Sequence, residues 1–219
     1  MTTPHEREVA FVGRITAGAT HEFRNILAIV KESAGLIEDL VLVSGPGGAP
    51  DRETVLRAVA RIEAQVGRGA DLAGALNRLA HALEQPEEAV DLGREVEQAA
   101  RLSERFVRRR ERRLRLRPVA GDSFAKVNSL GLCMALVAAV DLCVQQVPEG
   151  GAVLVAVERP RGEPAVVFTG EDADACAHAV RADGIGSAGL TELVAGLGGR
   201  VESAADGSGF LVVFPAGSS

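Results

Sequence analysis

Two long stretches of the chain place apolar or small residues alternately three and four positions apart. The first stretch runs from about His5 to Val43 without a proline. Its repeating positions are Val9, Val12, Thr16, Ala19, Phe23, Ile26, Val30, Ser33, Ile37 and Leu40. This spacing is typical of helices that pack along a heptad seam. At about 1.5 Å per residue the helix is roughly 55 Å long, and a helix of that length needs partners to be stable.

The second stretch follows a break at 44–50, where glycine and proline end the first helix. Asp51 is the predicted N-cap of the second helix. The seam positions are Val55, Val59, Ile62, Val66, Gly69, Ala73, Leu76, Ala80 and Leu83, and Pro86 closes the stretch. We therefore predict an antiparallel helical hairpin over residues 1–87. Further apolar positions, such as Leu27 and Leu72, exceed what one hairpin covers, which predicts a homodimer with a four-helix bundle.

Residues 88–219 mix the two periodicities, which predicts a second domain of α/β sandwich type. Helices are expected at about 91–111, 130–147 and 189–197, and the almost wholly apolar middle helix should be buried. Strands are expected at 114–119, 152–158, 165–169, 200–204 and 209–215, the last two joined around Asp206-Gly207. Glu87 and Glu88 are interpreted as a solvated linker. The predicted fold class of the whole chain is α+β.

Composition and charge narrow the function classes. Apolar residues make up 47% and charged residues 25%, as in ordinary soluble proteins. No apolar run reaches the ~20 residues that span a bilayer, and the polar N-terminus is no signal peptide. Cys133, Cys143 and Cys176 are odd in number and form no CxxC pair, which fits a reducing compartment. We therefore predict a cytoplasmic protein that does not associate with membranes.

The net charge of −6 argues against nucleic acid as a partner. The basic run from Arg108 to Arg117 opposes that argument. We interpret the run as the solvated end of a helix, because Glu111 interrupts it, and leave a docking patch for an acidic partner as the alternative. His5, His81 and His178 show no metal-ligand spacing, and no metal site is predicted.

The chemistry-bearing stretch is 13–30. His21 is two residues from both Ala19 and Phe23, so it points away from the seam, toward water. Glu22 is its neighbour, and Asn25 is one turn further on. An exposed imidazole beside a carboxylate can accept a phosphoryl group, because the neutral ring nitrogen is a nucleophile and the carboxylate can take its proton or hold the tautomer. From spacing alone, a plain surface histidine is the favoured interpretation.

These residues resemble the H-box of sensor histidine kinases, Ala-Gly-x-x-His-Glu-(aliphatic or Phe)-x-Asn-Pro-Leu. Ala17-Gly18, His21-Glu22-Phe23, Asn25 and Leu27 are in register with it, and Ile26 stands where the family usually has proline. The resemblance implies that His21 is the phosphoacceptor and Glu22 its acid/base neighbour. It also implies that Asn25 orients a water or an incoming aspartyl phosphate.

The resemblance continues into the ATP-binding domain of that family, a domain of the GHKL type. Val90-Asp91-Leu92, Pro148-Glu-Gly-Gly151 and the glycine-rich segment 184–199 match its outline. The ATP chemistry does not match. Counting back from Pro148 puts Ala138 and Leu142 where the family has two asparagines for magnesium and phosphates, and Asp141, one position off, should face elsewhere.

The adenine and lid regions depart as well. No Asp-x-Gly-x-Gly follows Phe168, and only about a dozen residues precede Gly184. Apolar side chains cannot replace buried polar groups that select a base or a metal. We therefore expect no ATP binding and no cofactor, with Gly184 and Gly186 as a vestigial glycine box.

The family includes dimeric histidine phosphotransferases with a degenerate ATP-binding domain. By this resemblance we predict a bacterial two-component phosphorelay protein that carries phosphoryl groups between response-regulator aspartates and His21 without using ATP. The receiver domain would supply Mg²⁺ and most of the electrostatic stabilisation. The expected partners are a second copy, receiver domains and a hybrid histidine kinase.

Three alternatives remain open from the sequence. The chain could be a non-catalytic pseudokinase scaffold that binds a response regulator or a kinase. It could be an ATP-dependent histidine kinase. It could also be a receiver phosphatase, in which Asn25 would matter more than His21.

Overall fold

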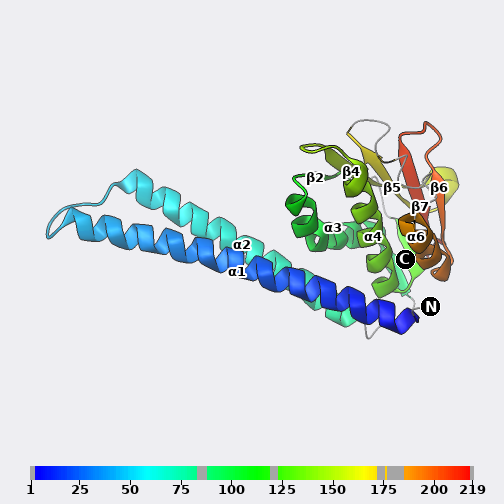
Figure 1. The fold of residues 1–219 in the computed structure, drawn as a ribbon, viewed down its shortest axis with the longest axis horizontal. Helices are drawn as coiled ribbons and strands as arrows, with labels where there is room; N and C mark the ends of the chain where they lie inside the picture. The colour runs from blue at the N-terminus through cyan, green and yellow to red at the C-terminus, as the bar shows by residue number, and fades with distance from the viewer. Residues whose placement is uncertain (1–2, 83–87, 119–122, 172–175, 177–184, 218–219) are drawn as a thin grey trace. The chain divides into compact units, whose positions relative to one another are not determined.

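The computed structural model describes residues 3–82, 88–118, 123–171, 176 and 185–217 (Figure 1). The chain divides into two compact units, residues 1–77 and 78–219. The domain boundary predicted between residues 87 and 88 adjoins the segment 83–87, which lies outside the described residues.

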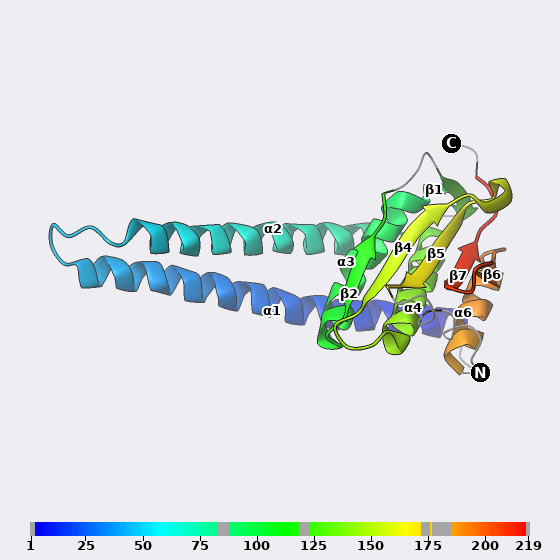
Figure 2. The same cartoon turned by 90° about the horizontal axis from the view of Figure 1, so that it is seen from above.

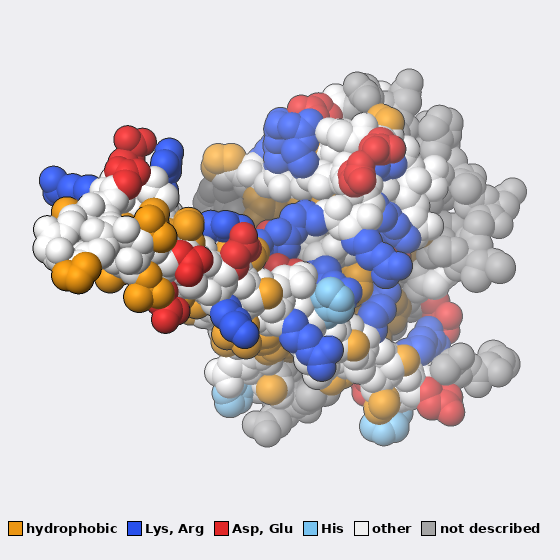
Figure 3. All heavy atoms as spheres, turned by 60° about the vertical axis from the view of Figure 1, so that its left-hand side comes forward, with side chains coloured by type: hydrophobic (Ala, Val, Ile, Leu, Met, Phe, Trp, Pro, Cys, Tyr) orange, Lys and Arg blue, Asp and Glu red, His pale blue; other side chains and the backbone are white. Residues whose placement is uncertain are grey.

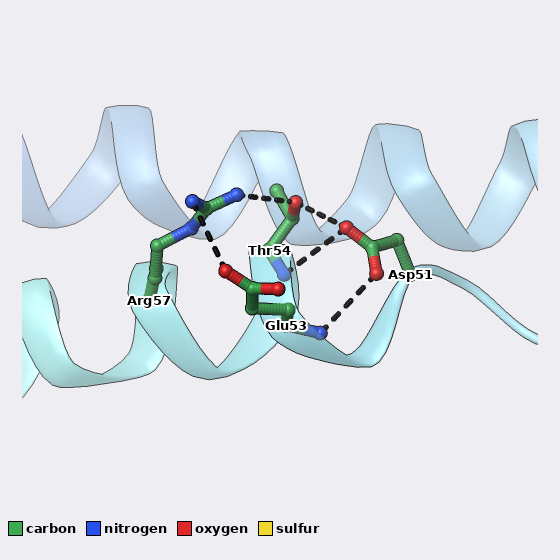
Figure 4. Close-up of polar contacts among 4 residues, drawn as sticks. All are labelled: Asp51, Glu53, Thr54 and Arg57. Atoms are coloured by element: carbon green, nitrogen blue, oxygen red, sulfur yellow. Dashed lines mark hydrogen bonds and ion pairs between the residues drawn. The ribbon is translucent and has the colours of Figure 1, made fainter.

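Two long helices make an antiparallel hairpin, as Figure 2 shows. Helix α1 spans Pro4–Ser44 and helix α2 spans Arg52–Ala82, close to the predicted bounds. Helix α1 begins with a capping box, in which the Thr3 side chain and the Glu6 side chain each accept the other's backbone N–H. The carboxylate of Asp51 accepts the N–H groups of Glu53 and Thr54, so the predicted N-cap of α2 is confirmed (Figure 4).

The seam between the two helices runs along a different flank of α1 from the predicted one. The buried residues of α1 are Phe11, Ile15, Gly18, Ala19, Glu22, Ile26 and Ser33. The predicted positions Ala19, Ile26 and Ser33 are confirmed, but Thr16 is exposed and Phe23 only half-buried. Apolar residues occupy two adjacent flanks of this helix, so their spacing alone does not decide which flank meets α2.

The second unit is α+β, as predicted. Its elements are β1 (Glu88–Asp91), α3 (Leu92–Arg109), β2 (Arg113–Leu116), β3 (Phe124–Val127), α4 (Ser129–Gln146), β4 (Ala152–Glu158), a 3₁₀ turn (Pro160–Gly162), β5 (Ala165–Gly170), α6 (Ile185–Gly196), β6 (Arg200–Ser203) and β7 (Gly209–Val213). Five strands form one sheet in the order β2-β4-β5-β7-β6, with β2 and β4 parallel and the other pairs antiparallel. Strands β1 and β3 form a separate antiparallel pair, which the sequence did not predict, and Glu88 belongs to β1 rather than to a linker.

Helices α3, α4 and α6 lie against one face of the sheet (Figures 1 and 2). The rings of Phe168 on β5 and Phe210 on β7 stack with centroids 5.1 Å apart, and both are fully buried. Within the described residues, α4 alone is long and apolar enough to span a bilayer. Because 67% of its 18 residues are buried inside the unit, α4 is the central core helix that the sequence predicted.

Candidate functional site

His21 lies in the N-terminal half of α1, and its side chain is exposed in the hairpin, as predicted. Asn25 is one turn further along and is exposed as well. Residues four apart on a helix are neighbours, so the imidazole and the amide share one flank of α1. An imidazole and an amide on an open helix surface can be approached together by a docked partner. Their roles in phosphotransfer stay predictions.

Glu22 does not accompany His21 to the surface. It occupies a seam position, where its side chain is 12% exposed, and its Oε1 lies 2.8 Å from an Nη of Arg68 on α2. A carboxylate removed from water needs such a partner, because an unpaired buried charge is strongly unfavourable. Sequence reasoning did not single out Arg68, since a cross-helix partner leaves no signal in local spacing.

The seam beside this ion pair is apolar. The Cβ position of Gly69, the residue after Arg68, lies 3.8–3.9 Å from side-chain atoms of Ile26 and Phe23. Ile26 is 4% exposed, and α1 continues through it without interruption. Ile26 stands where the H-box of sensor histidine kinases usually has proline. Its side chain packs in the seam, and its backbone leaves the helix unbroken.

A second cross-helix ion pair joins Arg61 of α2 to Glu32 of α1, with an N–O distance of 3.3 Å. Its side chains are 50% and 68% exposed, whereas that of Arg68 is only 26% exposed. The two pairs have the same chemistry in different surroundings. Exposed ion pairs contribute little to stability because water screens them. The less exposed pair beside His21 is therefore expected to restrain the two helices more strongly.

Large apolar side chains stay exposed on both helices of the hairpin, and Figure 3 shows them between charged groups. They include Val9, Leu27, Leu36 and Val41 on α1 and Leu56, Val59 and Val66 on α2. Leu27, six residues after His21, is 65% exposed and lies about 120° around the helix from it, at 3.6 residues per turn. A partner that covers Leu27 therefore leaves the imidazole accessible.

Two positions of this chain were aligned by sequence with the magnesium-binding asparagines of histidine kinases, and neither has a polar side chain. Ala138 and Leu142 are half-buried apolar residues of α4. Asp141 accepts a hydrogen bond of 2.6 Å from Arg110 and one of 3.3 Å from Gln145, and its orientation away from a nucleotide stays a prediction. Within the described residues, no three His, Cys, Asp or Glu side chains are grouped to hold a metal ion.

Several residues that were compared by sequence with the ATP site of histidine kinases fall outside the described residues. These are Gly184 and residues 172–174 after β5. His178, which belongs to no predicted site, also lies outside the described residues. Gly186 is described and belongs to the first turn of α6. Helix α6 ends as predicted, because Gly198 adopts a φ of +71°, a conformation that favours glycine.

Only Arg108 and Arg109 of the basic run lie at the end of a helix, because α3 ends at Arg109 and the rest of the run continues through a turn into β2. Arg112 donates to the carbonyl of Val147 at 2.7 Å, and Arg115 pairs with Glu171 at 2.9 Å. Glu111 has a φ of +55°, and the neighbouring carboxylate of Glu149 raises its pKa. Much of the run therefore joins the turn and strand to the rest of the unit.

The three cysteines are buried free thiols. Burial raises the pKa of Cys133 to about 12, and it also raises the pKa of Cys143, which adjoins Cys176. Protonated thiols are poor nucleophiles. The cysteines therefore serve as small apolar residues of the core.

No protein-family model and no curated protein sequence matches this chain. Solved structures do match it. They include the mycobacterial sensor histidine kinase MprB (23% identity, 61% of this chain and 100% of that one, TM-score 0.46) and the Acinetobacter baumannii histidine kinase AdeS (16%, 90% and 98%, 0.47). A structure described as a bacterial phosphotransferase matches at 15% identity over 93% and 95% of the two chains, with a TM-score of 0.45. Because these TM-scores are below 0.5, the function proposed next rests on this chain's own residues.

Proposed function

We propose that this chain is a homodimeric histidine phosphotransferase of two-component signalling, which relays phosphoryl groups between receiver-domain aspartates and His21. The observation that carries the proposal is the exposed imidazole of His21, within an H-box-like sequence, on an unbroken 41-residue helix of an antiparallel hairpin. Such a helix presents the nucleophile in a fixed orientation to a docked receiver, and orientation supplies much of the rate of a bimolecular transfer.

The chemistry is one reversible displacement at phosphorus. The unprotonated nitrogen of the neutral His21 ring attacks the phosphorus of an aspartyl phosphate. The N–P bond forms as the bond from phosphorus to the carboxyl oxygen breaks, and the aspartate leaves as a carboxylate. The ring keeps its other N–H and gains a positive charge, which the transferred phosphoryl group balances. Mg²⁺ held by the receiver neutralises the phosphoryl oxygens, as in other phosphoryl transfers.

We propose further that the second unit does not use ATP. The apolar side chains of Ala138 and Leu142 and the pairing of Asp141 with Arg110 support this. A phosphotransferase takes its phosphate from an acyl phosphate and needs no nucleotide. By the same argument the chain would work in the cytoplasm, where receiver domains and hybrid kinases present their phosphorylated aspartates.

The dimer is proposed from the exposed apolar flank of the hairpin. Covering Leu27 and Val66 from each copy would complete a four-helix bundle. His21 would remain accessible on both sides of that bundle, because it lies on another flank of α1 than Leu27. Each dimer would then offer two acceptor sites to receivers.

The test is transfer of label from receiver domains phosphorylated with radioactive acetyl phosphate in Mg²⁺, with no ATP present. We expect the wild-type protein and His5→Ala, a control at another exposed histidine of α1, to be labelled, and His21→Ala to remain unlabelled. Equal labelling of His21→Ala would overturn the proposal. Receiver binding without any labelling of the wild type would establish the scaffold, and labelling by ATP alone the kinase. Accelerated loss of receiver label that depends on Asn25 rather than His21 would establish the phosphatase.

A further inference from the structure

The ion pair between Glu22 and Arg68 stands where the hairpin would otherwise bury apolar side chains. The neighbouring seam positions of α1 hold Ala19 and Ile26, which are 6% and 4% exposed. Replacing a buried ion pair by apolar residues of similar volume is often neutral or stabilising, because both charges lose their hydration. Stability alone therefore does not explain a glutamate and an arginine at this place.

The pair lies directly beside the candidate acceptor. Glu22 follows His21 in the chain, and Arg68 reaches it from the opposite helix at 2.8 Å. Consecutive residues of a helix point about 100° apart. Fixing the Glu22 side chain in the seam therefore also fixes the direction in which α1 presents the imidazole of His21.

We propose that Arg68 is a positioning residue for phosphotransfer, which acts through Glu22 on the orientation and protonation of His21. The proposal rests on the phosphotransferase function argued above. Arg68 holds the Glu22 carboxylate in the seam and offsets its charge next to the imidazole. The neutral ring is the form of an imidazole that can attack phosphorus.

Removal of Arg68 has two consequences. The Glu22 carboxylate either turns toward water, which disturbs the position of α1 at His21, or remains in the seam without the guanidinium of Arg68. An uncompensated carboxylate next to an imidazole favours the protonated ring. Within one turn of Glu22 or Arg68 along their own helices, the other charged residues are Arg24 on α1 and Asp71 on α2, and both stay unchanged in the variants.

The experiment compares Arg68→Gln with Arg61→Gln, which breaks the exposed cross-helix pair with Glu32. The rate of label transfer from an acetyl-phosphate-labelled receiver is measured between pH 5.5 and 8.5. We expect Arg68→Gln to slow transfer about tenfold at pH 7 and to raise the pH of half-maximal rate by about one unit. Arg68→Lys should restore most of the rate, and Arg61→Gln should remain within about twofold of the wild type.

A second comparison keeps the test decisive if Arg68→Gln fails to fold. In a Glu22→Gln background the uncompensated charge is gone, so adding Arg68→Gln should change the rate by less than about twofold. A further tenfold loss there would show that Arg68 acts on its own and would overturn the proposal. An Arg68→Gln protein with wild-type rate and pH profile would also overturn it. A wild-type protein that takes up no label would instead refute the phosphotransferase function itself.

Discussion

The helical hairpin and the α+β unit bury their residues in opposite ways. In the α+β unit, helix α4 is apolar on nearly every side. Phe168 and Phe210 stack in the core of this unit and are fully buried. The hairpin instead places the charged pair Glu22–Arg68 in its seam and leaves Leu27 65% exposed. The α+β unit buries most of its large apolar side chains in a core, whereas the hairpin leaves several of its large apolar side chains exposed.

The same contrast holds for the polar residues of the histidine-kinase pattern. The hairpin keeps His21 and Asn25 exposed on α1. On α4 the corresponding nucleotide-binding positions are Ala138 and Leu142, which add to the apolar surface of the core helix. Under the proposed function the chemistry belongs to the hairpin, while the α+β unit contributes a stable fold.

The largest effect should come from Phe168→Ala, which deletes a fully buried ring from the sheet core. We expect a loss of about 3–5 kcal/mol in the free energy of unfolding, from the lost burial and the cavity left behind. Phe23→Ala in the hairpin removes the same group from a half-buried position and should cost clearly less. Urea unfolding of both variants measures the difference. Equal losses in the free energy of unfolding would show that the hairpin and the α+β unit are packed alike, contrary to the difference described above.

A smaller effect is expected for Leu27→Glu, which places a charge on the exposed apolar flank of α1. Two copies of this leucine meet the bundle interface of the proposed dimer, and burial of each contributes about 1.5 kcal/mol or more. The dimer should therefore dissociate roughly 100-fold more readily, which sedimentation at several concentrations would measure. Leu116→Glu, a matched change at a partly exposed leucine of β2, should leave association unchanged. A concentration-independent monomer in the wild type would refute the dimer.

Local sequence signals predicted most of the secondary structure. Asp51 capped α2 as expected, and the apolar run 129–146 formed the core helix. The prediction was incomplete where pairing over long distances decides the outcome. Strands β1 and β3 have four residues each, and their pairing joins segments about 35 positions apart, so neither is recognisable alone.

The candidate site was predictable in part for the same reason. The exposure of His21 followed from helical spacing, because that is a property of α1 alone. The burial of Glu22 did not follow, since it depends on which flank of α1 meets α2 and on Arg68, 46 residues away. Likewise, Asp141 could be placed off the nucleotide-binding face, but its partner Arg110 on another element could not be predicted.

The smallest effect concerns the tip of the hairpin, where only the first turn of α2 depends on its cap. The Asp51 carboxylate accepts hydrogen bonds from the hydroxyl and N–H of Thr54 and from the N–H of Glu53 (Figure 4). The Thr54 hydroxyl is the main cause that lowers the pKa of Asp51 from 3.8. Its stabilising effect is therefore complete above pH 3.8, the value in the unfolded chain, and is lost as pH falls through the lowered pKa of the folded state.

Asp51→Ala should accordingly melt at a slightly lower temperature than the wild type at pH 7, and the difference should shrink as pH falls below 3.8. Amide exchange should quicken in the first turn of α2, at Glu53 and Thr54, and stay unchanged around His21, because capping acts within one turn. Glu53→Gln is the matched control, since it removes a neighbouring charge and leaves the cap in place. A melting difference that stayed constant as pH fell below 3.8 would show that Asp51 acts through packing rather than through its carboxylate. Faster exchange at His21 would show that the tip is coupled to the acceptor and that the hairpin responds as one cooperative element.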